Sequence, residues 1–158
     1  MQKFPKWTAS DIPSQRGRSA IVTGTGGLGY ETALELAKNG AEVILAGRDK
    51  AKGTEAVKMI RTCVSSANIR FEELDLANLA SVQAFGQRMN KERQSLDLLI
   101  NNAGVMTPPT RKTTKDGFEL QLGTNYLGHF ALTAHLMPLL RRGNNPRVVH
   151  LSSIAHRS

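Results

Sequence analysis

The sequence predicts an α/β protein built on a doubly wound parallel sheet of about five strands. The alternation of strand and helix patterns along the chain and the position of the polar residues support this prediction. Five short apolar segments alternate with segments of helical periodicity, and such alternation produces crossover connections between parallel strands. Polar and glycine-rich residues follow the strands directly, at the edge where sheets of this kind bind ligands.

The first two strand–helix units are the most regular. Small and β-branched residues predict a strand at Ser19–Val22, and apolar spacing predicts a helix at Gly29–Asn39 that Gly40 ends. A continuous apolar run at Glu42–Ala46 predicts the second strand. The helix that follows, Asp49–Arg61, begins with an aspartate that we expect to cap it.

The second half of the chain continues the pattern with longer elements. Alternating residues predict a strand at Ile69–Leu74, and spacing by three or four predicts a helix at Leu79–Met89. Apolar runs predict strands at Leu96–Ile100 and Arg147–Leu151, the second of them as a buried strand, with a long helix at about Asp116–Leu140 between them. The predicted apolar face of this helix consists of Phe118, Leu122, Tyr126, Phe130, Thr133, Met137 and Leu140.

Composition excludes several classes of protein. The 158 residues carry 21 basic and 13 acidic side chains, but short basic groups without aromatic partners do not indicate a nucleic-acid-binding protein. The single cysteine, Cys63, excludes a disulfide scaffold, and the spacing of the four histidines does not suggest a metal site. No signal peptide and no window of ~18 apolar residues is present, so we expect a cytoplasmic protein without a membrane partner.

A glycine-rich loop joins the first predicted strand to the first predicted helix. Glycines there let the backbone approach a pyrophosphate, and the free N–H groups of the helix start would hold the anion. A tight turn without a ligand remains the alternative. The loop, which we predict to bind a dinucleotide, contains Gly24, Thr25, Gly26, Gly27, Leu28 and Gly29.

Arg48 follows the second strand, where a dinucleotide-binding domain contacts the adenosine ribose. An acidic residue at this place binds the 2′-hydroxyl, whereas an arginine accommodates a 2′-phosphate. The sequence therefore favours NADP, with NAD as the second choice. The alternative is an arginine that is merely solvated.

Polar residues also follow the third and fourth strands. The carboxylate of Asp75, with the backbone of Leu76, can hydrogen-bond an adenine ring, or Asp75 can begin a helix instead. Asn101, Asn102, Ala103 and Gly104 suit a tight turn against a flat ring, although alone they would indicate only a loop.

Taken together and in this order, these segments resemble the short-chain dehydrogenase/reductase family. The resemblance covers nearly the whole chain and includes Asn125 within a Thr-Asn-Tyr-Leu-Gly-His segment, and Ser152-Ser153 after the fifth strand. The sequences of two segments, Leu45–Arg48 and Ser152–His156, are most similar to the retinol-dehydrogenase-like branch. The sequence of Lys6–Pro13 is most similar to bacterial members.

The resemblance implies a Rossmann-like dinucleotide-binding domain over residues 18–158, preceded by an N-terminal extension over residues 1–17. It implies hydride transfer between NADP(H) and an alcohol or carbonyl substrate. Asn125 would help hold a water in a proton relay, with a buried amide satisfied by backbone as the alternative. Ser153 would hydrogen-bond the substrate, or else simply end a strand. The remaining matches are the loop glycines Gly24, Gly27 and Gly29, the adenine contacts Asp75 and Leu76, and the cofactor-lining residues Asn102, Ala103 and Gly104.

Two departures from the family pattern qualify these expectations. The glycine loop is one residue shorter than usual between Gly24 and Gly27, which puts its geometry toward the phosphates in question. Neither tyrosine, Tyr30 or Tyr126, is followed four residues later by the lysine that lowers its pKa in the family. We therefore expect the 158 residues to be a fragment without turnover of their own, or a non-catalytic nucleotide-binding module. The substrate and a homo-oligomeric state stay open.

Overall fold

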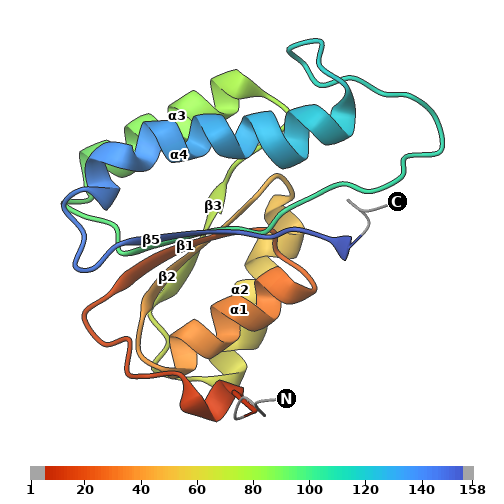
Figure 1. Ribbon diagram of the computed structural model, residues 1–158. Coiled ribbons are helices and arrows are strands. Elements are labelled where there is room, and N and C mark those ends of the chain that lie inside the picture. Colours follow the sequence, from red (N-terminus) through yellow and green to blue (C-terminus); the bar gives the residue numbers. More distant parts are fainter. Residues whose placement is uncertain (1–5, 155–158) are drawn as a thin grey trace, which may run out of the picture.

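The computed structural model describes residues 6–154, which form a parallel sheet between two layers of helices (Figure 1). Five strands lie in the order β3-β2-β1-β4-β5, and the α/β class predicted from the sequence is confirmed. Among the described residues, no helix is long and apolar enough to cross a membrane. The elements are η1 Ala9–Asp11, β1 Ser19–Thr23, α1 Leu28–Lys38, β2 Glu42–Gly47, α2 Lys50–Cys63, β3 Ile69–Glu73, α3 Leu79–Glu92, β4 Leu98–Asn101, η2 Leu122–Leu127, α4 Gly128–Leu140 and β5 Arg147–His150.

The strand order reverses direction at the centre of the sheet. β1 pairs in parallel with β2 on one side and with β4 on the other, so the loops that follow β1 and β4 are neighbours. Helices α1 and α2 cover one face of the sheet, and α3 and α4 cover the other (Figure 1). This reversal is the place where ligands bind in open α/β sheets.

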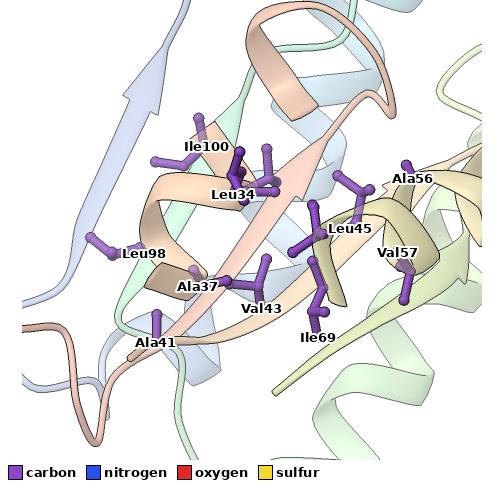
Figure 2. Packing of buried hydrophobic residues seen from close by; sticks show 14 residues of the cluster. Leu34, Ala37, Ala41, Val43, Leu45, Ala56, Val57, Ile69, Leu98 and Ile100 are labelled. Carbon is purple, nitrogen blue, oxygen red and sulfur yellow. The ribbon is translucent and has the colours of Figure 1, made fainter. Parts of the chain in front are cut away.

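The side chains of the strands alternate between two apolar clusters, one on each face. Ala20 and Val22 belong to the cluster beneath α1 and α2, in which Figure 2 shows Val43 and Leu45. Ile21 packs on the opposite face beneath α3 and α4. The period of two along a strand produces this division. Because both faces are covered, β1 is buried along its whole length, as its apolar sequence predicts.

The predicted caps of the early helices are confirmed. The carboxylate of Asp49 accepts the backbone N–H of Lys52 at 3.0 Å and caps α2. Asn39 is the C-cap of α1, and Gly40 follows it with φ of +90°. A left-handed residue at this place is the usual glycine termination of a helix.

The long helix begins later than predicted. Instead of a helix from Asp116, the chain makes a turn closed by an antiparallel bridge between Thr113 and Glu119, with Gly117 at φ of +84°. The Glu119 carboxylate then accepts the backbone N–H groups of Gln121 and Leu122, and these hydrogen bonds lower its pKa. Asp116 accepts the N–H of Leu79 instead. The helical spacing of apolar residues extends into this segment, but its polar side chains stabilise a turn instead of a helix. The predicted start was therefore wrong.

The predicted apolar face of the long helix was also wrong. Tyr126 and Phe130 are 61% and 65% exposed, and of the predicted face only Leu140 belongs to the side that packs on α3 and the sheet. The buried residues of that side are His129, Leu132, Leu136, Leu139 and Leu140. Because α4 is apolar nearly all round, periodicity alone did not distinguish the two faces.

β5 differs from the prediction of a buried strand. Within the described residues it pairs only with β4, and most of its side chains are exposed, as is Leu151 after it. Apolar side chains are exposed on β5 at Val149 and on the outer side of α4 at Phe130.

A buried carboxylate fastens the amino ends of the strands. Asp97 is 4% exposed, and its Oδ2 accepts the backbone N–H and the hydroxyl of Ser19 at 2.7 and 3.1 Å. Its Oδ1 accepts the N–H of Asn144 at 2.6 Å, in the turn before β5. One side chain therefore joins the start of β1, the start of β4 and the approach to β5.

Asp97→Asn should lower the free energy of unfolding by about 2 kcal/mol, because an amide group places a donor against one of these buried donors. Urea denaturation measures the change. Asp116→Asn is the matched control, since Asp116 accepts a single N–H at an exposed position, and its effect should stay below about 1 kcal/mol. Equal effects of the two substitutions would contradict the role given to Asp97.

Candidate functional site

A cavity of about 530 Å³ lies at the carboxyl ends of the strands. The loops that follow β1, β2, β3 and β4 line it. The cavity therefore lies where the sheet topology predicts a ligand site. Most of the predicted cofactor-binding residues line this cavity, namely Gly24, Thr25, Gly26, Leu28, Arg48, Asp75, Leu76, Asn102, Ala103 and Gly104.

The glycine loop is packed against the loop after β4. A Cβ atom at Gly24 would lie 2.8 Å from Asn102 Nδ2, and one at Gly29 would lie 2.6 Å from the same atom and collide with the Gly24 carbonyl oxygen. A Cβ at Gly26 would meet nothing within 4 Å. Close packing therefore requires glycine at positions 24 and 29 but not at 26.

The start of α1 carries backbone donors toward the cavity edge. Its N-cap is Gly27, which has φ of +52° and no side chain that could satisfy the N–H groups of the first turn. An N-terminus of this kind attracts anions through its free N–H groups and the helix dipole. Open space lies beside this N-terminus, because a Cβ at Gly26 or at Gly27 would meet nothing within 4 Å.

Two cations lie where β2 passes into α2. Arg48 and Lys52 both line the cavity and are exposed to it, one on each side of the capping residue Asp49. Lys52 was not predicted, because its position in the first turn of a helix resembles that of any solvated lysine. Arg48 precedes the N-cap of α2 and Lys52 lies in its first turn, so both charges lie at the N-terminal end of α2.

Asp75 makes a local turn and does not begin α3. Its Oδ1 accepts the N–H of Ala77 at 3.0 Å, and its own N–H donates to Ser81 Oγ. The N-cap of α3 is Asn78. The alternative of a helix-starting aspartate is therefore wrong, and Asp75 and Leu76 both face the cavity.

The loop after β4 is held to the end of β1 by Thr23. The Thr23 hydroxyl oxygen accepts the backbone N–H groups of Asn102 and Ala103, each at 3.0 Å, and the Asn102 side chain donates to the Thr23 carbonyl at 2.8 Å. Thr23 is fully buried and lies next to Gly24. Sequence reasoning missed it, since a threonine at the end of a strand carries no distinctive signal.

Asn125 lies on a π-helical turn, η2, and does not line the cavity itself. Its side chain makes a bidentate pair with the backbone of Val105: Oδ1 accepts the N–H and Nδ2 donates to the carbonyl, both at 2.8 Å. The backbone thus satisfies the amide, as the alternative predicted. The Asn125 side chain is exposed, however, and it contacts the loop at Gly104. π-helical turns are frequent at functional sites.

Ser153 follows β5 and is exposed, two residues beyond Leu151, which lines the cavity. The structure does not place Ser153 among the lining residues. The last residues of the segment that resembles the family, Ala155 and His156, lie outside the described residues.

A further residue that sequence reasoning missed is Thr124. It lines the cavity, is 7% exposed, and its hydroxyl has no hydrogen-bond partner among the described residues. Buried hydroxyl groups rarely lack a partner in folded proteins.

His129 lies buried behind the cavity and carries a perturbed pKa. Burial lowers the pKa below its ordinary value; the hydrogen bond to the Asn125 carbonyl opposes this change, and the titratable neighbour His150 on β5 adds to it. The unfolded chain therefore binds a proton at a pH where folded His129 stays neutral.

Stability should fall as the pH drops below about 6.5, with a contribution from His129 of at most ~1.4 kcal/mol per pH unit, and this contribution should level off below its folded pKa. Urea denaturation at a series of pH values measures the slope. His129→Gln should flatten it, and an equal slope in the wild type and in His129→Gln would contradict the assignment.

Comparison with known proteins supports one family. The model of the short chain dehydrogenase family matches residues 18–158. Mouse retinol dehydrogenase 13 is 49% identical over 141 residues, covering 89% of this chain and 42% of that protein. The crystal structure of an uncharacterized protein from Mycobacterium paratuberculosis superposes with a TM-score of 0.81 at 44% identity, covering 95% of this chain and 51% of that chain. Pseudomonas aeruginosa RhlG, solved in an active-site complex with NADP, superposes with a TM-score of 0.78 at 28% identity, covering 92% of this chain and 58% of that chain.

The chain spans about half the length of the curated relatives it matches. The family comprises NAD(P)-dependent oxidoreductases that act on alcohol and carbonyl substrates, and the NADP-bound relative shows that the fold can hold this cofactor. The sheet order, the glycine loop after β1 and the family match over residues 18–158 have one explanation: the chain belongs to the short chain dehydrogenase family.

Proposed function

We propose that this chain binds NADP(H) in the cavity at the carboxyl edge of the sheet. It would form the cofactor-binding part of an oxidoreductase that acts on an alcohol or carbonyl substrate. The observation that carries the proposal is the open backbone of the glycine loop at the N-terminus of α1. Gly26 lines the cavity, and a Cβ at Gly26 or at the N-cap Gly27 would meet nothing within 4 Å, so an anion can approach the backbone there.

The cavity residues divide into groups that suit the parts of a dinucleotide. The α1 N-terminus would hold the pyrophosphate, and Arg48 with Lys52 would bind the 2′-phosphate that distinguishes NADP from NAD. Asp75 and Leu76 would contact adenine. Asn102–Gly104, held in place by Thr23, would line the far end of the cofactor.

When bound, the cofactor would supply hydride chemistry, and the protein would orient it and the substrate. Asn125 and Ser153 belong to the same proposal, as the residues that would position a water and the substrate. A cytoplasmic location and a small-molecule substrate complete it.

Nucleotide binding without catalysis is the second candidate, and one observation favours it. A general acid of lowered pKa is required for carbonyl reduction, but Tyr30 and Tyr126 are followed four residues later by Leu34 and Phe130. Under this candidate the chain binds NADPH and does not oxidise it when a carbonyl substrate is added.

A fluorescence titration of the 158-residue chain with NADPH and with NADH tests the proposal. We expect saturable binding of NADPH with a dissociation constant at least about tenfold lower than that of NADH, a difference of ~1.4 kcal/mol. A folded chain that binds neither nucleotide, or binds both equally, would overturn it. Consumption of NADPH with a carbonyl compound separates the two candidates.

A further inference from the structure

The side chain of His129 connects two segments that the sequence separates widely. It is 3% exposed and is the second residue of α4, which continues directly from η2. Its Nε2 lies 2.9 Å from the Thr23 hydroxyl at the end of β1, and its Nδ1 lies 2.9 Å from the Asn125 carbonyl oxygen. The imidazole thus spans the space between the cofactor cavity and the π-helical turn.

The partners determine where the imidazole proton lies. A carbonyl oxygen only accepts, so Nδ1 carries the proton that it donates to Asn125. In the neutral ring Nε2 is then an acceptor. The Thr23 oxygen already accepts the N–H groups of Asn102 and Ala103, so its own hydrogen is directed to His129 Nε2.

We propose that His129 is a positioning residue that holds the loop after β4 in its cofactor-lining conformation through Thr23 and couples that loop to the turn bearing Asn125. The part of this inference that NADPH binding tests rests on the proposed function. The hydrogen bonds run in one direction, from the amides of Asn102 and Ala103 through Thr23 and His129 to the Asn125 carbonyl.

The geometry explains why the histidine acceptor matters. The other acceptor within reach of the Thr23 hydroxyl is the Ile100 carbonyl, at a long 3.4 Å. Without Nε2 the hydroxyl turns toward Ile100, and its lone pairs turn away from the two amides. Asn102 also fills the space between Gly24 and Gly29, so a shift of the loop after β4 reaches the glycine loop.

Two conservative variants separate the two ends of the imidazole. Glutamine carries its amide at the depth of Nε2 and retains an acceptor for Thr23, whereas asparagine carries its amide at the depth of Nδ1 and retains only the donor to Asn125. We expect His129→Asn to weaken NADPH binding about tenfold or more and His129→Gln to stay within about threefold. His135→Asn, on the same helix, is the control and should bind as the wild type does.

The same variants are tested without nucleotide by measuring hydrogen exchange of the Asn102 and Ala103 amides. These amides should be protected in the wild type and in His129→Gln, and should exchange about tenfold faster in His129→Asn. Thr23→Val should release them as well, and Thr23→Ser should not. If His129→Asn does not fold, His129→Gln decides by the same readout, because Asn102 and Ala103 amides that exchange faster in it than in the wild type would overturn the inference.

The outcomes distinguish the two proposals. A wild type that does not bind NADPH overturns the proposed function, while exchange at Asn102 and Ala103 still tests the role of His129. A wild type that binds NADPH, together with His129→Asn that binds equally well and protects both amides, overturns this inference alone. Equal losses in His129→Gln and His129→Asn would also overturn it, because they would show that the acceptor for Thr23 has no separate role.

Discussion

Gly29→Ala is expected to weaken NADPH binding by about 100-fold or more and to lower the free energy of unfolding by about 3 kcal/mol. The added methyl group would collide with the Gly24 carbonyl oxygen and lie 2.6 Å from Asn102 Nδ2. Backbone atoms of a tight turn cannot yield as a flexible side chain can. The loop must therefore open, which moves the N–H groups that would hold the pyrophosphate.

Gly26→Ala is the matched control for this substitution. A Cβ at position 26 meets nothing within 4 Å, so stability should change by less than about 0.5 kcal/mol even though Gly26 lines the cavity. Urea denaturation and an NADPH titration on both variants measure the two effects separately. A Gly29→Ala protein with wild-type stability and wild-type affinity would show that the close packing of the glycine loop is unimportant.

Arg48→Ala should remove most of the preference for NADPH over NADH, by weakening NADPH binding ~30-fold while NADH affinity stays within about twofold. The 2′-phosphate would lose a planar, bidentate partner and retain only Lys52 nearby. Because both cations are exposed, the difference should shrink as the salt concentration rises.

Arg141→Ala serves as the control, since Arg141 is an exposed arginine at the far end of α4 and does not line the cavity. It has the same change in net charge and should leave both affinities as they are. Parallel losses in Arg48→Ala and Arg141→Ala would assign the effect to overall charge. Equal losses of NADPH and NADH affinity in Arg48→Ala alone would place Arg48 elsewhere on the cofactor.

The sequence predicted the parts of the structure that local patterns determine. Strand–helix alternation, the glycine turn after β1 and the cap at Asp49 each depend on neighbours within a few residues, and each lies where it was expected. The position of Arg48, Asp75 and Asn102 at one cavity followed from topology, because the carboxyl ends of parallel strands meet at one edge.

The errors arose where tertiary packing decides between equivalent local patterns. An apolar pattern on both sides of α4 did not show which side faces the sheet, so Phe130 was placed inward although it is 65% exposed. The hydrogen bond between Thr23 and His129 joins residues 106 positions apart, and neither residue has an unusual local context. Contacts of this kind become visible only in the folded molecule.

The central claim, that the carboxyl edge of the sheet binds NADP(H), is tested most directly by mapping amide chemical-shift changes on the 158-residue chain during a titration with NADPH. The account predicts saturable changes at Gly24–Gly29, Arg48, Asp75 and Asn102–Gly104, with none at the opposite edge around Arg18 and Asp97. Changes confined to that opposite edge, or no saturable change in a folded protein, would contradict it.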